Sequence, residues 1–501
     1  MPTPRPTPRP TRLLRHLLLG SALGVLVGGS EPAAAAGIAA GSVAWSAARG
    51  VAGDAGAPPR RHDAPPAAPA PRRSNAAPTI PTPGARHLAP DTTTTSFTVG
   101  GLPVILRRVT ANDVVAANLY LLGGTRQVPP ELAGLEPFLL DASERGTAAY
   151  PRDRLRQRMA RLGTLIGIDA DHDWTTFALR STGATFDSTW AIFADRLMRP
   201  TLDSSEVELV RTQLLSGVRQ RRDSPDALLE YLADSLAFAG HPYGVAPSGT
   251  ERSIARITLD DLRRYHREQM VTSRMLLVVV GDVDRAQLER LVGATLARLP
   301  RGEYAWKAPE PPGTRPAALA VARRTLPTNY LLGYFPGPSA ASDDYHPLRI
   351  ATAVLSGRFF AEIRSKRNLS YAVHAPFVDR AVATGGVYVT TVDPRTTLGL
   401  MRDELRNLQE GWITPRGLDQ LVQQFITEYF LDNETNADQA DFLARAQLYR
   451  GDWRRASRFV EELRAVTPND VRRVARRYLH DLRLAYVGDP SRIDEAAVRA
   501  F

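Results

Sequence analysis

Residues 257–284 read ITLDDLRRYHREQMVTSRMLLVVVGDVD, and residues 466–490 read VTPNDVRRVARRYLHDLRLAYVGDP. Each stretch has a threonine followed three residues later by an aspartate, a spacing typical of a capping box at the start of a helix. An amphipathic helix follows in both stretches, and then a strand that ends on Gly-Asp. Such self-similarity is typical of a repeated structural unit. The sequence therefore predicts a duplicated domain made of two similar α+β modules.

The chain of 501 residues is too long for one ordinary domain, since domains typically have about 100–200 residues. We predict an N-terminal module over residues 96–304 and a C-terminal module over residues 319–492. A proline-rich linker joins them over residues 305–318. The expected strands are 97–99, 104–106, 114–122, 174–179, 330–334, 371–373 and 387–392. The expected helices are 151–162, 187–198, 204–222, 344–355, 357–367, 396–411 and 415–431.

The N-terminal residues have the pattern of an export signal. Arginines precede an apolar run of about thirteen residues, and a small-residue stretch at Ala33–Ala36 offers a cleavage site. We predict a signal peptide over residues 1–36 and a disordered Ala/Pro-rich tether over residues 37–95. The protein is then expected to be exported, to the periplasm. An uncleaved membrane anchor or a misassigned start codon is the alternative.

The net charge of +10 does not indicate nucleic-acid binding, because most of it lies outside the modules. Residues 1–90 contain ten arginines and three acidic residues, which accounts for seven of these charges. The folded part is therefore close to neutral and offers no basic patch to a phosphate backbone. The chain has no cysteine, which excludes disulfides, thiol nucleophiles and sulfur-ligated zinc.

The sequence contains no complete metal or catalytic motif. None of the nine histidines lies three or four positions from another, so no helix presents two imidazoles to one zinc ion. The densest group of ligand-type residues is Asp169, Asp171, His172 and Asp173. Consecutive strand residues point to opposite faces, so we interpret this group as a solvated strand end.

One stretch of the first module carries a family resemblance. GGTRQVPPELAGLEPFLLDASERGT (residues 123–147) resembles the opening helix of the pitrilysin/insulinase family of zinc peptidases. That family has Gly-Ser-Arg, a spacer, Gly-x-x-His-Phe-Leu-Glu-His and then Gly-Thr. Aligned on this pattern, the first histidine falls on Pro137, the glutamate on Leu140 and the second histidine on Asp141. QLLSGVRQRRDSP (residues 213–225) resembles the helix that supplies the third ligand, a glutamate, and Gly217 stands at that position.

The resemblance extends over about residues 96–490. HPYG (residues 241–244), Gly249-Thr250 and the stretch 258–283 match the family, as does LSGRFFAEIRSKRNLSYAV (residues 355–373) in the second module. It implies two homologous modules, each a mainly antiparallel sheet packed with helices. It also implies that this chain has no metal site and no cofactor, because three of the four replacements offer no side-chain ligand and one carboxylate cannot hold a catalytic zinc.

An arginine and a tyrosine seven positions apart are further features of the family, in which they face the zinc across a closed chamber. Here they are Arg364 and Tyr371, and the resemblance implies that both bind substrate. A guanidinium and a phenol can donate hydrogen bonds to peptide carbonyls and to oxyanion charge. Without the resemblance, Arg364 is equally well a surface ion-pair partner and Tyr371 a core residue.

Some bacterial members of the family resemble a split enzyme, in which one subunit keeps the zinc helix and the other keeps the arginine–tyrosine pair. This chain looks like the second kind. The expected function is that of a non-catalytic subunit of an exported heterodimeric zinc peptidase. Its partner is then a paralogous subunit that holds the zinc, and a peptide is the substrate. The alternative is a non-enzymatic structural or peptide-binding scaffold of the same fold.

Overall fold

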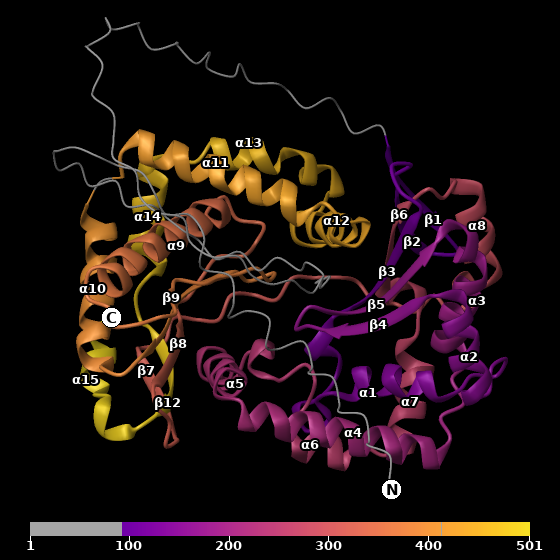
Figure 1. Cartoon of the computed structure of the whole chain (residues 1–501). Coiled ribbons are helices and arrows are strands. Elements are labelled where there is room, and N and C mark those ends of the chain that lie inside the picture. The colour runs from indigo at the N-terminus through magenta and orange to yellow at the C-terminus, as the bar shows by residue number, and fades with distance from the viewer. Residues whose placement is uncertain (1–92, 412) are drawn as a thin grey trace, which may run out of the picture. The chain divides into compact units, whose positions relative to one another are not determined.

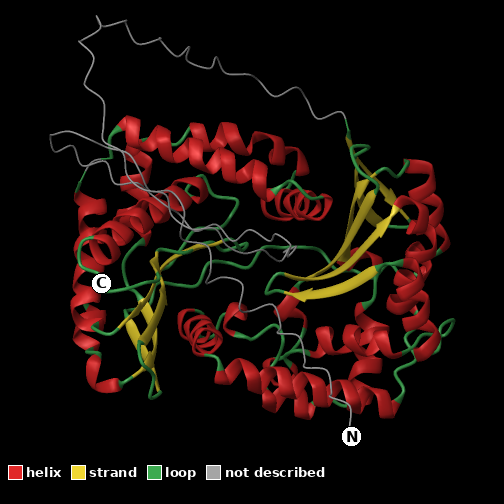
Figure 2. Cartoon of the chain, in the orientation of Figure 1, coloured by secondary structure: helices red, strands yellow, loops and turns green. Residues whose placement is uncertain are grey.

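The computed structural model describes residues 93–411 and 413–501 (Figures 1 and 2). The expected signal peptide and nearly all of the expected tether lie outside these residues. The first strand begins at Thr94, so regular structure starts inside the last two residues assigned to the tether. Within the described ranges, no helix combines the length and the apolar character that crossing a bilayer requires.

The N-terminal sheet has the order β1-β2-β6-β3-β5-β4. All neighbouring strands are antiparallel except β2 and β6, which are parallel. β1 and β2 form the expected hairpin, whose two turn residues Gly100 and Gly101 both have positive φ. The strands are β1 (Thr94–Val99), β2 (Leu102–Arg108), β3 (Val114–Leu122), β4 (Leu165–Ala170), β5 (Trp174–Thr182) and β6 (Met275–Gly281).

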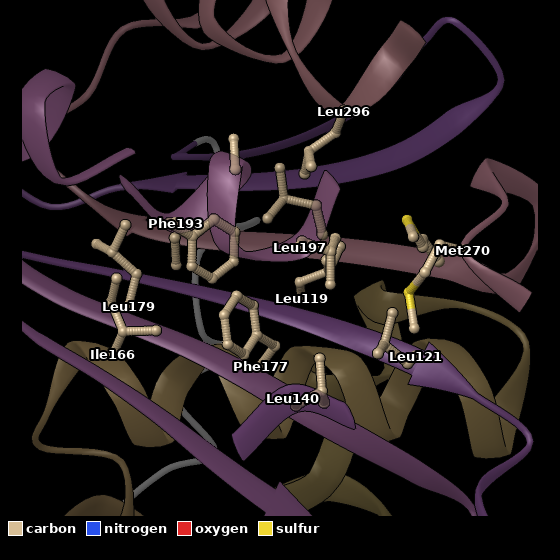
Figure 3. Packing of buried hydrophobic residues seen from close by; sticks show 14 of the residues in the cluster. Leu119, Leu121, Leu140, Ile166, Phe177, Leu179, Phe193, Leu197, Met270 and Leu296 are labelled. Atoms are coloured by element: carbon tan, nitrogen blue, oxygen red, sulfur yellow. The ribbon is translucent and has the colours of Figure 1, made fainter. Parts of the chain in front are cut away.

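One face of this sheet packs against helices of its own module. Side chains of β3 and β5 meet side chains of α3, and Phe177 stacks on Phe193 with the ring centroids 4.7 Å apart (Figure 3). The helices are α1 (Leu135–Ala142), α2 (Arg152–Leu162), α3 (Phe186–Met198), α4 (Ser204–Asp223), α5 (Pro225–Ala237), α6 (Glu251–Arg256), α7 (Leu259–Gln269) and α8 (Arg285–Ala294).

The C-terminal sheet has the order β10-β11-β8-β12-β7, with β9 paired to β11. β7 pairs with β12 in parallel and was not predicted, because its residues were assigned to the linker or left without structure. The module therefore starts with a strand before the one expected at 330–334. The strands are β7 (Ala318–Arg323), β8 (Asn329–Tyr334), β9 (Val373–His374), β10 (Phe377–Val378), β11 (Thr384–Thr391) and β12 (Arg483–Gly488).

The helices of the C-terminal module include one continuous helix where two were predicted. α9 runs without a break into a π-helical turn at Phe360–Ser365, in place of separate helices at 344–355 and 357–367. Beyond residue 431, the helix that follows Thr467 was predicted from the repeated stretch 466–490, and the other helices there were not. The helices are α9 (Tyr345–Phe359), α10 (Pro394–Glu410), α11 (Pro415–Asp432), α12 (Asn436–Arg450), α13 (Phe459–Arg464), α14 (Pro468–Tyr478) and α15 (Glu495–Arg499).

Each sheet has its second face covered by a helix of the other module. α12 packs on β3 and β6, and α5 packs on β8 and β12 (Figure 1). Both central strands of the first sheet are therefore buried on both faces, which explains their nearly continuous apolar sequences. The two modules share their cores through these helices.

The duplication is confirmed in its details. Thr258 and Asp261 form a capping box at the start of α7, and Thr467 and Asp470 form one at the start of α14. The strands that follow, β6 and β12, end at Gly281 and Gly488. The fold is α+β with two similar modules and mainly antiparallel sheets, as predicted.

Candidate functional site

The helix expected to carry the zinc ligands is α1. It begins directly after Gly134, whose φ is 87° and whose missing Cβ would lie 2.7 Å from the Ile254 side chain. A glycine is required there because other residues rarely adopt this conformation. Pro137 is the third residue of the helix, where its lack of an N–H costs nothing, since the first-turn N–H groups have no intrahelical partner.

The positions of the family's metal ligands do not form a metal site here. Leu140 is 1% exposed and packs in the core (Figure 3). Asp141 is half-buried, and burial together with the nearby Glu144 raises the pKa of Asp141 to about 6. Gly217 lies on α4 with open space where a side chain would be. Among residues 93–411 and 413–501, no group of three or more His, Asp or Glu side chains is placed to hold a metal ion.

A buried ion pair, which sequence reasoning missed, lies beside these positions. The Glu136 carboxylate is 2.5 Å from Arg274 Nη2 and accepts a hydrogen bond of 2.9 Å from Tyr265 Oη. The Arg274 Nε–H donates to the Leu122 carbonyl at 2.7 Å. Burial and the Glu136 charge raise the pKa of Tyr265 well above its usual value, so its hydroxyl stays a donor. The pair ties α1 to α7 and to the end of β3.

Arg364 and Tyr371 lie together. The Arg364 guanidinium carbon is 4.6 Å from the centroid of the Tyr371 ring and 5.0 Å from that of Phe360. Asn368, with a φ of 51°, ends the helical segment between them, and its N–H donates to the Arg364 carbonyl. The backbone thus turns back just after the π-helical turn, which brings the two side chains into contact.

The environment of this pair differs from that of ordinary surface or core residues. Tyr371 is 62% exposed, so it is not a core residue. Among the described residues Arg364 is in no ion pair, whereas Lys366 and Arg367 both pair with Glu362. Arg364 is half-buried between two rings, and its N–H groups have no hydrogen-bond acceptor in the described part of the chain.

The interpretation of residues 169–173 as a solvated strand end is wrong for His172 and Asp173, whereas Asp169 is exposed. His172 is 4% exposed and Asp173 is 1% exposed, because these residues lie where the two modules meet. The Asp173 carboxylate accepts hydrogen bonds from Tyr243 Oη at 2.8 Å, from Tyr449 Oη at 3.0 Å and from the Ala381 N–H at 2.9 Å. Tyr243 belongs to the stretch 241–244, so that motif supplies a buried donor to the junction.

We expect Asp173→Asn to destabilise the junction between the modules. The amide would put N–H atoms against groups that now donate to the carboxylate, at a cost of about 1–3 kcal/mol. Chemical denaturation measures the change in the free energy of unfolding. Asp419→Asn, at an exposed position of α11, is the control. If both variants are equally stable, the carboxylate does not hold the junction.

The fold consists of two α+β modules, each of which places a helix on the sheet of the other. The candidate site is a helix on which other residues stand at the positions of the metal ligands. The family description "Insulinase (Peptidase family M16)" matches residues 103–251, and "Peptidase M16 inactive domain" matches residues 256–425. The chain belongs to the insulinase family, peptidase family M16. In this member, residues that cannot hold a catalytic zinc stand at the ligand positions.

Several relatives cover most of the chain. It is 21% identical to the uncharacterized zinc protease YmxG of Bacillus subtilis (strain 168) over 400 residues, which is 77% of this chain and 96% of the relative. It is 24% identical to mitochondrial-processing peptidase subunit beta of Blastocladiella emersonii over 407 residues, 77% of this chain and 86% of the relative. It is 24% identical to mitochondrial cytochrome b-c1 complex subunit 1 of Caenorhabditis elegans over 390 residues, 74% and 82% of the two chains.

A solved structure confirms the fold class. The crystal structure of a peptidase M16 inactive domain from Pseudomonas fluorescens matches with a TM-score of 0.72 and 20% identity. The match covers 79% of this chain and 98% of the other.

Proposed function

We propose that this chain is the non-catalytic subunit of an exported heterodimeric zinc peptidase. The observation that carries the proposal is a contrast between two places in the molecule. The ligand positions on α1 and α4 hold Pro137, Leu140, Asp141 and Gly217. Arg364 and Tyr371, by contrast, are present and in contact, and the Tyr371 ring is exposed. The fold alone does not require an exposed ring stacked on an arginine that has no carboxylate partner among the described residues.

Arg364 and Tyr371 are proposed to bind the peptide near the scissile bond. Stacking on Tyr371 orients the guanidinium plane and leaves its N–H groups available to carbonyl oxygens. A positioned donor stabilises negative charge that develops on a carbonyl oxygen, and this is worth most in a site closed to water. The zinc and the catalytic glutamate are proposed to belong to the partner subunit.

The edge strand β4 is proposed to bind the substrate by pairing with it as an additional strand of the sheet. It is the last strand of the N-terminal sheet, Leu165 on it is 70% exposed, and Gly167 has open space beside it. A free strand edge can pair with an extended peptide through main-chain hydrogen bonds. We expect a bound peptide to slow hydrogen exchange of the amides in β4.

The edge at the other end of the same sheet, β1, is the internal control for this exchange measurement. Slower exchange in β4 with no change in β1 supports strand pairing. Equal protection of both edges, or of neither, contradicts it.

The partner and the export remain proposals that other observations support. Two of the relatives are named as subunits, one of a processing peptidase and one of the cytochrome b-c1 complex. The signal-like residues 1–36 and the absence of cysteine support export to the periplasm. The partner is expected to be a paralogue with an intact His-x-x-Glu-His helix.

The test is to purify the chain alone and together with such a paralogue from the same organism. The chain alone is expected to contain no stoichiometric zinc and to cleave no peptide. The co-purified pair is expected to contain one zinc per heterodimer and to hydrolyse peptides. Zinc or proteolysis in the chain alone would overturn the proposal.

The second candidate is a non-enzymatic scaffold of the same fold. The similarity to cytochrome b-c1 complex subunit 1 favours it, since that relative is named as a subunit of a complex and not as a peptidase. The two candidate functions predict different zinc contents and peptidase activities for the co-purified complex. A complex that contains no zinc-bearing subunit and has no peptidase activity would favour the scaffold.

A further inference from the structure

A small cavity lies in the C-terminal module between α9, α12, α13 and the 3₁₀ turn Trp453–Arg458. Its volume is about 60 Å³. One water needs about 10–15 Å³ by this measure, so the cavity has room for one small polyatomic ion. It is distinct from α1 and from the Arg364–Tyr371 pair, and none of the functions proposed above uses it.

The cavity is lined by an excess of positive charge. Four arginines face it, and two carboxylates, Asp379 and Glu462, do so as well; the arginines are Arg349, Arg445, Arg450 and Arg455. Asp379 binds Arg349 Nη2 at 3.0 Å, and Glu462 binds Arg455 Nη2 at 2.7 Å and Arg450 Nη2 at 3.3 Å. The lining therefore carries two more positive than negative charges, which is costly in a partly buried space.

Arg445 is the guanidinium without a carboxylate of its own. Its Nη1 donates to the Asp379 carbonyl at 2.9 Å, and its other contacts are the rings of Trp174 and Tyr449. Asp441 and Asp171 also act on it electrostatically, but neither lines the cavity. Asp441 is hydrogen-bonded to Tyr120 and Asn118, and Asp171 is paired with His172. Inside the cavity Asp379 acts on Arg445 as well, but this carboxylate already pairs with Arg349, so the lining keeps its excess of two positive charges.

Several buried nitrogen atoms of the lining lack a hydrogen-bond partner. They are Nε of Arg349, Nε of Arg450 and Nδ1 of His346, among the residues that the structure describes. The two arginine nitrogens are donors. Burial lowers the pKa of His346, and its Nε2 donates to the Glu462 carboxylate at 2.8 Å, so its Nδ1 is an acceptor and does not face the anion as a donor. The side chains of His346 and Arg450 are only 8% and 10% exposed. Buried polar atoms are nearly always paired, so unpaired donors beside a cavity indicate a bound acceptor.

We propose that this cavity binds a phosphate-class dianion. Two excess charges match the charge of about −1.5 to −2 that a phosphoryl group carries at pH 7. Arginine forks suit tetrahedral oxyanions because they donate in pairs, and a monocarboxylate would leave one charge uncompensated. The ligand is either free phosphate or the phosphoryl group of a small phosphomonoester.

The site also lies at the junction of the two modules. Arg445, Tyr449 and Arg450 come from α12, which covers the N-terminal sheet. Tyr449 also donates to Asp173 of the first module. An anion that neutralises these arginines would hold α12 in place, so its binding stabilises the contact between the modules.

The experiment is a titration of the purified chain with sodium phosphate, followed by thermal unfolding and by calorimetry. Sodium chloride at matched ionic strength and sodium acetate are the comparison salts. We expect a saturable rise of several degrees in Tm with phosphate only, because a ligand that binds the folded state alone stabilises it. An equal rise with chloride or with acetate overturns the proposal.

Two variants locate the site. Arg450→Gln and Arg455→Gln each remove one positive charge from the lining, and Glu462 keeps another partner in each case. Both are expected to weaken phosphate binding at least tenfold. Arg454→Gln is the matched control, since Arg454 is an exposed neighbour that pairs with Asp452 and does not line the cavity. Unchanged binding in both lining variants, with Tm values near that of the parent, overturns the assignment.

Phenyl phosphate distinguishes the two sources of the ligand. Binding of this ester as well as of phosphate supports a phosphoryl group on a larger molecule, and binding of phosphate alone supports the free ion. Absence of binding for both anions overturns the proposal. These measurements need no peptidase partner, so their outcome is independent of the proposed function.

Discussion

Arg364→Ala is expected to reduce the turnover of the reconstituted heterodimer by about 100-fold or more, the cost of removing one donor to a developing oxyanion. The guanidinium stands over the Tyr371 ring and has no ion-pair partner among the described residues, so alanine removes a donor without breaking an ion pair. The loss should appear in kcat and in kcat/KM alike, as for an interaction made only in the transition state. Steady-state kinetics with a fluorogenic peptide measures it.

Arg367→Ala is the matched control for this experiment. Arg367 lies three residues further on in the same segment, is exposed and pairs with Glu362. It should leave turnover nearly unchanged. Arg364→Lys should recover only part of the activity, because a lysine keeps the charge and lacks the planar fork that stacks on a ring. Full activity in Arg364→Ala, with the heterodimer and its zinc intact, would make this arginine a structural residue.

Helices and turns whose ends are marked by short sequence motifs were predicted correctly. The capping boxes at Thr258 and Thr467 fix the starts of α7 and α14, and the Gly100–Gly101 turn fixes the first hairpin. These features depend on residues within a few positions of one another. A repeat of such features predicted the duplicated fold without any knowledge of long-range contacts.

Elements that depend on distant partners were missed. β7 is a six-residue strand beside a proline-rich stretch, and the strand it pairs with, β12, is more than 150 residues away in the sequence. α12 has apolar residues around much of its surface because it packs on the other module's sheet and also against α11 and α13 of its own module. A single amphipathic stripe, the usual signal of a surface helix, is therefore absent from α12.

The residues of the candidate site that belong to a recognisable family motif were predicted from the sequence. The alignment placed Pro137 and Leu140 on a helix and Arg364 near Tyr371, and the structure puts them on α1 and in ring contact, respectively. Charged residues of the interior were not predicted. Asp173 and Glu136 look like surface residues in the sequence, because the partners that make their burial possible lie far along the chain.

Glu136→Ala is expected to destabilise the N-terminal module by about 3–5 kcal/mol, the usual cost of removing one partner of a buried ion pair. The variant leaves Arg274, which is 0% exposed, with its charge unpaired in the core, and it leaves the hydroxyl of Tyr265 without its acceptor. Urea denaturation followed by tryptophan fluorescence measures the change. Glu131→Ala, on an exposed residue shortly before α1, is the control and should change stability by less than about 0.5 kcal/mol.

A double substitution separates the ion pair from the packing around it. Glu136→Leu combined with Arg274→Met replaces both charges by apolar side chains, so no charge is left buried alone, and the loss should be much smaller than that of Glu136→Ala. Such recovery identifies the unpaired arginine as the cause of the instability. If the double variant is as unstable as Glu136→Ala, the arginine contributes through its hydrogen bond to the Leu122 carbonyl, and that bond holds the end of β3 against the turn before β6.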